Sequence, residues 1–441
     1  MIYPKNPDIK EIEREEIQDS TKWGVLGAHD PSIFKDNDIF YVFSTDARVE
    51  GRALPAVQIR KSRDLINWQY VGRAIDDVPQ EAKNWTMAEG VWAPEAIKVE
   101  NQYYLYYCAS SFGKNKSCIG LLKADSITGP WRDEGIVIKT DNGDDRNAID
   151  PNLIFDIDGS LWMSYGSFWT GIYLVKLNKH TGKLDSEGDK GVRIAGRHHS
   201  TEGAIEGPYI IYNEQFKKYY LFVSYDSLAS DYNIRVGRSD SISGPYMDIN
   251  GVEMTDLNAE NPNHVGNKIA GGYRFGNKEG WIAPGHNSVL NNNGEYFIVH
   301  HIRKEFNPSW FYMHVRRILW SEDGWPMVSP ERYAGEIEQK KIEGVVLPGK
   351  WEFITLYRDV NRVMVSKEYE LRVSGEILGE YTGEWHIVED NIMVIKFEIR
   401  NEIEEYRGKV IPVWDWEKNK SSIAFTGIDS SGVALWGKRI K

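Results

Sequence analysis

The stretch AIDPNLIFDIDGSLWMSYGSFW, residues 148–169, carries the pattern that decides the fold. Pro151 opens a short apolar segment, a polar turn follows at Asp158-Gly159, and a second segment begins with the bulky pair Leu161-Trp162. Aromatic and β-branched runs broken by Gly, Asn and Asp are typical of strands and turns. These residues therefore predict a β-hairpin whose first strand begins at the proline, where the missing N–H does little harm.

The same pattern occurs five times along the chain. The residue pairs that open the repeats lie 63, 57, 57 and 76 residues apart, and they are Asp30-Pro31, Ala93-Pro94, Asp150-Pro151, Gly207-Pro208 and Ala283-Pro284. A period near 60 residues, with room for about four strands, predicts a propeller blade. The sequence therefore predicts an all-β fold, in which residues 1–23 lead into a five-bladed β-propeller over residues 24–335.

The C-terminal part of the chain follows a different pattern. From residue 336 the proline repeat is absent, and short alternating segments such as 369–373 and 392–397 take its place. Such segments are typical of antiparallel sheets. We expect residues 336–441 to form a separate antiparallel β-barrel or sandwich domain.

Composition excludes several classes of partner. The 441 residues include 53 Lys and Arg against 65 Asp and Glu, a net charge of −12, which argues against nucleic acid or an anionic membrane surface as partner. Cys108 and Cys118 are too few for a disulfide framework, and we expect two reduced thiols.

The charged N-terminus lacks the apolar core of a signal peptide, which predicts a cytoplasmic location for the chain as written, or an extracellular one if a signal had been removed. The sequence leaves the oligomeric state open.

Three of the five repeats place a carboxylate at the proline. Because the first strand of each propeller blade lines the central channel, the side chains beside the prolines should converge there. They are Asp30, Asp150 and Glu206, whereas the second and fifth repeats have Ala93 and Ala283. Crowded carboxylates repel one another and raise at least one pKa, an arrangement that clusters at functional sites.

The chemistry that best fits three such carboxylates is glycoside hydrolysis. One carboxylic acid protonates the leaving oxygen, a second carboxylate activates water or attacks directly, and a third can orient the acid. Aspartic-protease chemistry needs two carboxylates close enough to share a proton, and groups from separate blades are expected farther apart. A Ca²⁺ site is the other interpretation, because calcium prefers oxygen ligands.

The residues around the prolines carry a family resemblance. The motifs, in chain order, are His29-Asp30-Pro31-Ser32, Ser62-Arg63-Asp64-Leu65 with Trp68, Val91-Trp92-Ala93-Pro94-Glu95, Ser110-Ser111-Phe112-Gly113, Ala148-Ile149-Asp150-Pro151-Asn152, Met163-Ser164-Tyr165-Gly166-Ser167-Phe168-Trp169, Ile205-Glu206-Gly207-Pro208 and Pro284-Gly285-His286-Asn287-Ser288. As an ordered set they resemble glycoside hydrolase family 43, and within it the endo-acting α-1,5-L-arabinanases of the two-domain type.

The resemblance implies roles for the three carboxylates. It implies an inverting mechanism in which Asp30 is the general base, Glu206 is the general acid, and Asp150 orients this acid and tunes its pKa. Glu202 is a rival acid, and we prefer Glu206 because it abuts the repeat proline. Inversion requires the acid and base carboxyl groups to lie roughly 6.5–9.5 Å apart, which leaves room for a water molecule.

Substrate and metal contacts are also predicted. We expect Trp92 and Phe112 to be stacking platforms for sugar rings, with Trp169 as a further contact. His29, Asn152 and Ser167 are the predicted hydrogen-bonding neighbours, and for each of these six residues core packing is the alternative. The resemblance implies a Ca²⁺ ion in the channel, held by His286 and water. His198-His199 and His300-His301 are interpreted as ordinary loop or strand residues.

The leading functional hypothesis is hydrolysis of internal α-1,5 links in arabinan, a neutral polymer to which the acidic surface raises no objection. The first alternative is an exo-arabinanase, β-xylosidase or α-L-arabinofuranosidase on the same scaffold. The second is a sugar-binding propeller without catalysis, against which the presence of all three carboxylates argues.

Overall fold

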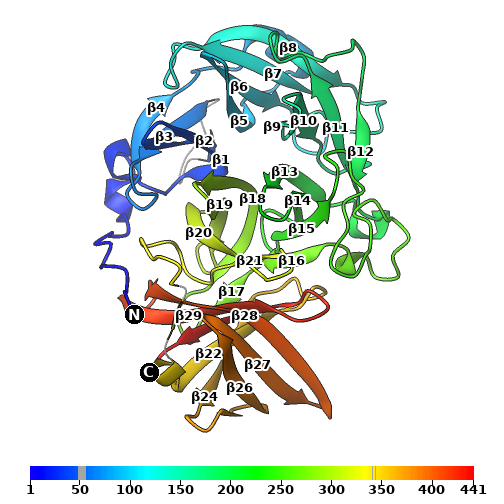
Figure 1. Ribbon diagram of the computed structural model, residues 1–441. Helices are drawn as coiled ribbons and strands as arrows, with labels where there is room; N and C mark the ends of the chain where they lie inside the picture. Colours follow the sequence, from blue (N-terminus) through cyan, green and yellow to red (C-terminus); the bar gives the residue numbers. More distant parts are fainter. Residues whose placement is uncertain (48–55, 340, 343) are drawn as a thin grey trace.

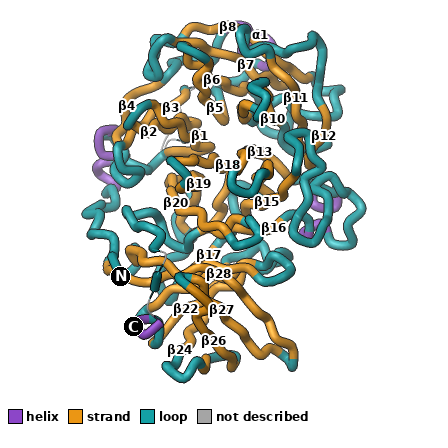
Figure 2. Tube along the Cα trace, in the orientation of Figure 1, coloured by secondary structure: helices purple, strands orange, loops and turns teal. Residues whose placement is uncertain are grey.

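The structure, a computed structural model, describes residues 1–47, 56–339, 341–342 and 344–441. Strands dominate this part of the chain, and its helical segments are short (Figure 2). They are the α-helix α1 (Gln80–Thr86) and the 3-10 turns η1 (Arg14–Glu16), η2 (Ser20–Lys22), η3 (His199–Thr201), η4 (Pro262–His264) and η5 (Gly344–Val346).

Five antiparallel sheets surround one axis, with β1, β5, β9, β13 and β18 innermost (Figure 1). Blades one and two contain β1 (Ala28–Asp36), β2 (Ile39–Asp46), β3 (Val57–Ser62) and β4 (Gln69–Arg73), then β5 (Trp92–Val99), β6 (Gln102–Ala109), β7 (Ser117–Ala124) and β8 (Arg132–Thr140). Blades three and four contain β9 (Asn152–Phe155), β10 (Leu161–Tyr165), β11 (Ile172–Leu177) and β12 (Val192–Ala195), then β13 (Ile205–Asn213), β14 (Lys218–Tyr225), β15 (Asn233–Ser239) and β16 (Asn267–Ala270). Blade five contains β18 (Trp281–Asn292), β19 (Glu295–Lys304), β20 (Phe311–Trp320) and β21 (Pro326–Val328). The predicted five-bladed propeller is confirmed.

The residue before each repeat proline adopts a left-handed backbone. The φ values are 48° at Asp30, 39° at Ala93, 59° at Asp150, 58° at Gly207 and 52° at Ala283. A positive φ is uncommon outside glycine, and in blades one, two, four and five it coincides with a break in register between the inner strand and its neighbour. Such bulges re-aim side chains, and they cluster next to active sites.

The C-terminal region is a closed eight-stranded barrel, so of the two predicted forms the barrel is the one observed. Its strands are β22 (Gly349–Leu356), β24 (Lys367–Leu371), β25 (Glu376–Leu378), β26 (Thr382–Glu389), β27 (Ile392–Ile399), β28 (Glu402–Asp415), β29 (Lys420–Ile428) and β30 (Ala434–Arg439). Trp351, Tyr369, Phe397 and Phe425 are among the aromatic side chains that form its buried core. The predicted boundary at residues 335–336 falls between β21 and η5.

The barrel packs beside blades four and five (Figure 1). The short strand β17 (Tyr273–Arg274) pairs with β18 and also, in parallel, with β23 (Met364–Val365), which extends the sheet of blade five into the C-terminal region. Buried Arg358 forms an ion pair of 3.1 Å with Asp248 of blade four. These contacts fix the barrel to the propeller, a junction that the sequence pattern did not predict.

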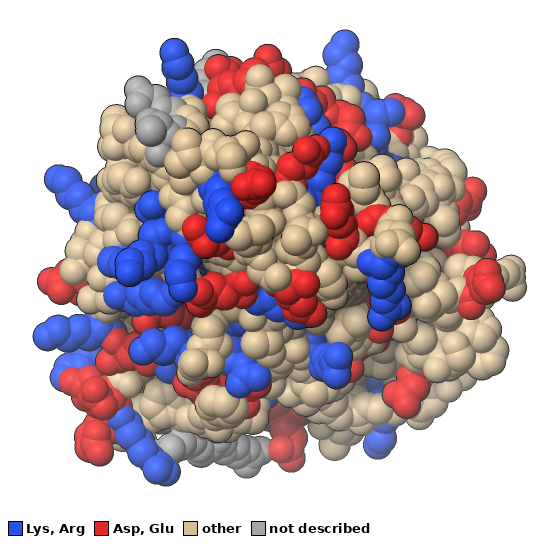
Figure 3. Space-filling model, turned by 90° about the horizontal axis from the view of Figure 1, so that it is seen from below, with Lys and Arg blue, Asp and Glu red and all other residues tan. Residues whose placement is uncertain are grey.

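The charged side chains on the surface and the state of the two cysteines agree with what the composition indicates. On the face seen in Figure 3, acidic and basic side chains are interspersed. Within the described ranges, no helix combines the length and the apolar character needed to cross a bilayer. Cys108 and Cys118 are both buried free thiols, as expected.

Candidate active site

The structure brings Asp30, Asp150 and Glu206 together from blades one, three and four. Asp30 lies in β1, Asp150 lies two residues before β9, and Glu206 lies in β13. The Gly207 N–H donates a hydrogen bond of 3.2 Å to Asp150 Oδ2, which ties blade four to blade three at this point. Both Glu206 and Asp30 act electrostatically on Asp150. The three carboxylates are therefore one interacting group.

Asp30 is buried and held by several donors. The Thr45 hydroxyl donates to Asp30 Oδ2 at 2.7 Å, and the Nδ1 atoms of His29 and His286 lie 2.7 and 3.2 Å from Asp30 Oδ1. Burial by itself would raise the pKa of Asp30, but the imidazoles of His29 and His286 outweigh it and hold this pKa well below its usual range. Asp30 is therefore ionised at neutral pH, as a general base must be.

The pKa of Asp150 is shifted in the opposite direction to that of Asp30. Burial raises the pKa of the Asp150 carboxyl well above its ordinary value, and the negative charges of Glu206 and Asp30 raise it further. The Asp150 carboxyl therefore holds a proton more readily than an ordinary aspartate does. Two carboxyl environments that diverge in this way are what acid–base catalysis needs.

Glu206 is oriented by two hydroxyl groups. The Ser167 hydroxyl lies 2.7 Å from Glu206 Oε2, and the Tyr232 hydroxyl lies 2.7 Å from Glu206 Oε1. The rival acid Glu202 is exposed at the end of η3, outside this network. Thr45 and Tyr232 were not predicted, because Thr45 lies near the end of β2 and Tyr232 directly precedes β15, positions for which the proline repeat gives no signal.

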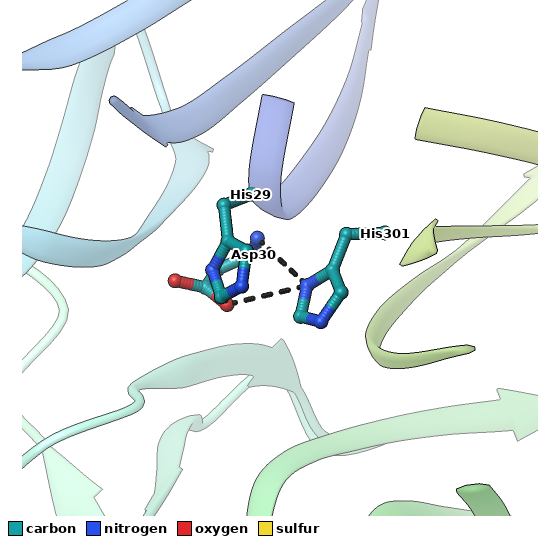
Figure 4. A group of neighbouring side chains, drawn as sticks. All are labelled: His29, Asp30 and His301. Atoms are coloured by element: carbon teal, nitrogen blue, oxygen red, sulfur yellow. Dashed lines mark hydrogen bonds and ion pairs between the residues drawn. The ribbon is translucent and has the colours of Figure 1, made fainter. Parts of the chain in front are cut away.

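His301 is a strand residue, as predicted, and it is also part of the site, which the sequence did not predict. It lies in β19, and its Nδ1 accepts a hydrogen bond of 3.2 Å from the Asp30 N–H (Figure 4). Its ring stacks on His29 with centroids 3.8 Å apart. Burial, with His29 nearby, lowers the pKa of His301 well below its usual value, so the ring is neutral. His198 and His199 lie in the loop at η3, as predicted.

A second layer of polar groups connects the inner strands. Glu95 accepts from the Ser32 hydroxyl at 2.5 Å and from the Asn152 amide at 3.2 Å, and Asn152 Oδ1 accepts from the Ile210 N–H at 2.9 Å. These bonds link blades one to four in turn. Burial raises the pKa of Glu95 to about 8. Asn152, a predicted substrate contact, is only 1% exposed and bonds to protein groups in this layer.

Two of the three predicted stacking residues, Phe112 and Trp169, are exposed to solvent. The rings of Trp92 and Phe112 lie 5.3 Å apart, and Phe112 is 81% exposed on the loop after β6. Trp169 is 38% exposed on the loop after β10, at a left-handed position with φ 43°. Exposed aromatic faces of this kind suit the apolar face of a sugar ring.

The donors in the channel that lie close enough together to share a metal ion do not include the predicted ligand. The ligand atoms of His29, Asp30 and His301 lie within 4.8 Å of one another, whereas the predicted ligand His286 reaches this group only through Asp30. The amide of the adjacent buried Asn287 has no hydrogen-bond partner within the described residues. Unsatisfied polar atoms of this kind call for water or an ion, so the donors fit a hydrated cation.

A propeller that gathers three carboxylates from separate blades, with the pKa of one lowered and that of another raised, defines a hydrolase of the acid–base type that cleaves glycosidic bonds. The sequence profile described as glycosyl hydrolases family 43 matches residues 26–326, and that of a C-terminal lipocalin-like domain matches residues 330–437. The chain belongs to glycosyl hydrolase family 43 and is a glycoside hydrolase.

Characterised relatives support this assignment. The chain is 31% identical to the extracellular endo-α-(1→5)-L-arabinanase of Thermotoga petrophila, over 96% of this chain and 95% of that protein. The crystal structure of the endo-1,5-α-L-arabinanase from Thermotoga petrophila superposes with a TM-score of 0.84 at 28% identity, over 95% of this chain and 99% of that one. The structure of Cellvibrio cellulosa α-L-arabinanase complexed with arabinohexaose covers 69% of this chain and 96% of its own, with a TM-score of 0.59 and 32% identity.

Proposed function

We propose that this enzyme is an endo-1,5-α-L-arabinanase that hydrolyses internal links of arabinan. The observation that carries the proposal is the group of Asp30, Asp150 and Glu206, with exposed Phe112 beside Trp92 as a sugar platform. The names of the relatives support the substrate class, since one is an endo-arabinanase and another was crystallised with arabinohexaose.

The mechanism follows from the environments of the three carboxylates. Asp30, kept ionised by its imidazole neighbours, takes a proton from the attacking water. Glu206, held by Ser167 and Tyr232, gives a proton to the leaving oxygen. Asp150 lies beside this acid and, because burial raises its pKa, holds a proton more readily than an ordinary aspartate. Attack by water opposite the leaving group inverts the anomeric configuration.

Time-resolved products on linear debranched arabinan test this function, with xylan and aryl glycosides beside it. We expect mixed oligosaccharides early in the reaction, because an endo-acting enzyme cuts at internal links. Monomer alone would contradict endo action and favour an exo-acting enzyme. Activity on xylan but not on arabinan would contradict the proposed substrate.

We further propose that His286 and water hold a Ca²⁺ ion in the channel. A cation there would favour the ionised forms of nearby carboxyl groups. Calcium prefers oxygen ligands, so a site with one imidazole relies on water for the rest. Treatment with a chelator should lower the melting temperature, and adding Ca²⁺ should restore it. An unchanged melting temperature, with no calcium in elemental analysis, would contradict the ion.

The relative from Thermotoga petrophila is described as extracellular. We propose the same location, which is the second of the two that the sequence left open and the one where polymeric arabinan occurs.

A further inference from the structure

Three parallel rings connect the two carboxylates that are proposed to act as acid and base. The Tyr232 ring stacks on His301 with centroids 5.6 Å apart and planes 15° apart, and His301 stacks on His29 at 3.8 Å and 15°. The Tyr232 hydroxyl bonds Glu206 at one end of the stack, and His29 Nδ1 bonds Asp30 at the other end. The stack therefore spans from acid to base.

The rings have little freedom to move. Tyr232 and His301 are 1% and 0% exposed. A Cβ atom at Gly285 would lie 1.9 Å from the Tyr232 ring, so the tyrosine lies flat against a glycine that no other residue could replace. The far side of His29 meets the edge of Phe311 at 4.8 Å, and the Arg303 guanidinium covers the Phe311 ring at 3.9 Å.

The hydrogen bonds also fix the orientation of the middle ring. The Asp30 N–H lies 3.2 Å from His301 Nδ1, and Asp30 Oδ1 lies 3.5 Å from the same nitrogen. The hydrogen bond from this N–H holds the left-handed backbone at Asp30, a conformation that costs energy outside glycine. His301 thus supports the base through its backbone as well as through the stack.

We propose that Tyr232 and His301 are positioning residues, and that the stack Tyr232–His301–His29 sets the spacing of the acid Glu206 and the base Asp30. This inference rests on the proposed function, because it gives a role to the distance between these two groups. Inverting hydrolysis depends on that distance, since a water molecule must fit between the base and the sugar. A displacement of about 1 Å at a reacting group can cost about 100-fold in rate.

The test compares substrates that differ in leaving group. Tyr232→Phe keeps the ring and removes the hydroxyl that orients the acid. We expect kcat on linear arabinan to fall at least about tenfold, with KM within about twofold. On an arabino-oligosaccharide with a dinitrophenyl leaving group, which departs without protonation, we expect a fall of less than about threefold. A merely structural role would lower both rates alike.

His301→Asn tests the base side of the stack. Asparagine can still accept from the Asp30 N–H but offers no ring to its neighbours. We expect kcat to fall about tenfold or more on both substrates, because both need the water to be activated. Equal falls on both substrates for Tyr232→Phe, or no fall for either variant, would overturn the proposal.

Tyr225→Phe is the matched control. Tyr225 is a buried tyrosine of the same blade whose hydroxyl has no hydrogen-bond partner within the described residues. We expect it to leave the ratio of the two rates unchanged, and the melting temperatures of all variants show whether they fold. If the unmodified enzyme fails on arabinan but cleaves another glycan, the proposed substrate is wrong, and the same leaving-group comparison on that glycan still tests the stack.

Discussion

The described residues include two groups of three carboxylates, one at the junction of propeller and barrel and one in the channel. At the junction, Glu331, Asp415 and Glu417 surround the Lys438 Nζ at 2.8, 3.1 and 2.5 Å. Lys438 is fully buried, and its pKa is raised well above the usual value, because the attraction of Glu331 and its two companions outweighs burial. This lysine places one permanent positive charge among the three carboxylates of the junction group.

The channel group has a different kind of partner. Asp30 is bonded by the imidazoles of His29 and His286 and by the Thr45 hydroxyl. An imidazole can itself gain or lose a proton. Imidazole partners therefore leave the carboxylates beside them able to gain or lose a proton as well. Three buried carboxylates therefore do not by themselves mark a catalytic site. A fixed cation at their centre indicates a structural role, and titratable or neutral partners indicate a chemical one.

The test with the largest expected effect removes the proposed general acid, Glu206, from the channel. We expect Glu206→Gln to lower kcat/KM on arabinan by about 10³-fold, because general acid catalysis contributes roughly 10²–10⁴-fold. Calorimetry should show that arabino-oligosaccharide binding is retained. Glu202→Gln, the exposed glutamate four residues earlier, serves as control and should behave as the unmodified enzyme. Full activity in Glu206→Gln would contradict the mechanism.

The corresponding test at the junction removes the cation. Lys438→Met leaves three carboxylates in a buried site, and we expect the free energy of unfolding to fall by about 3–5 kcal/mol. Denaturant titration measures this, and kcat of the folded fraction should not change. In the control Lys350→Met, an exposed pair with Glu368 is lost, which should cost at most about 1 kcal/mol. A comparably small effect for Lys438→Met would mean that the junction is not held by charge.

Glu95 provides a pH-dependent comparison within the channel. Burial raises the pKa of this carboxyl from 4.5 to about 8, so the folded state binds a proton that the unfolded state releases within this range. The contribution of Glu95 to stability therefore falls as pH rises from about 4.5 to about 8. Glu95→Gln lacks this titration, and its free energy of unfolding relative to the unmodified enzyme should rise by about 3–4 kcal/mol between pH 5 and pH 8. A pH-independent difference in denaturant titrations would contradict an elevated pKa.

The smallest predicted effect concerns His29. The imidazoles of His29 and His286 hold the pKa of Asp30 well below its usual range against burial. His29→Asn removes one of these groups, so the pKa of Asp30 should rise and the acid-side fall in kcat/KM should move to higher pH. A pH–rate profile measures this shift. The control His386→Asn, an exposed barrel residue, should leave the profile in place. A shift to lower pH in His29→Asn would contradict the electrostatic role.

The propeller and its inner strands could be predicted because the signal is local and repeated. Each blade has its own proline and turn, and the residue before the proline occupies the same left-handed position in all five blades. The C-terminal region was predicted less sharply, as barrel or sandwich, since alternating strands fit both. The pairing of β17 with β23 was not predictable, because two-residue strands far apart in the chain leave no periodic pattern.

Most of the predicted site lies on the repeat, and Ser167, which bonds Glu206, is an exception. Asp30, Asp150 and Glu206 occupy repeat positions, and the structure brings them together. Asn152 also lies on the repeat, yet the structure gives it internal partners in place of an exposed position. Whether a polar side chain faces substrate or another blade depends on the neighbouring blade, which the sequence of one repeat does not specify.

The sequence by itself determined the number of blades, the family and the three carboxylates, because these follow from residues close together in the chain. Only the tertiary structure decided which groups control those carboxylates. Asp30 meets His301 across a separation of 271 residues, and Lys438 meets Glu331 across the junction of two domains. The physical reason is that pKa values and side-chain orientation depend on neighbours within a few ångströms in space, and sheet register and blade packing bring those neighbours from distant parts of the chain.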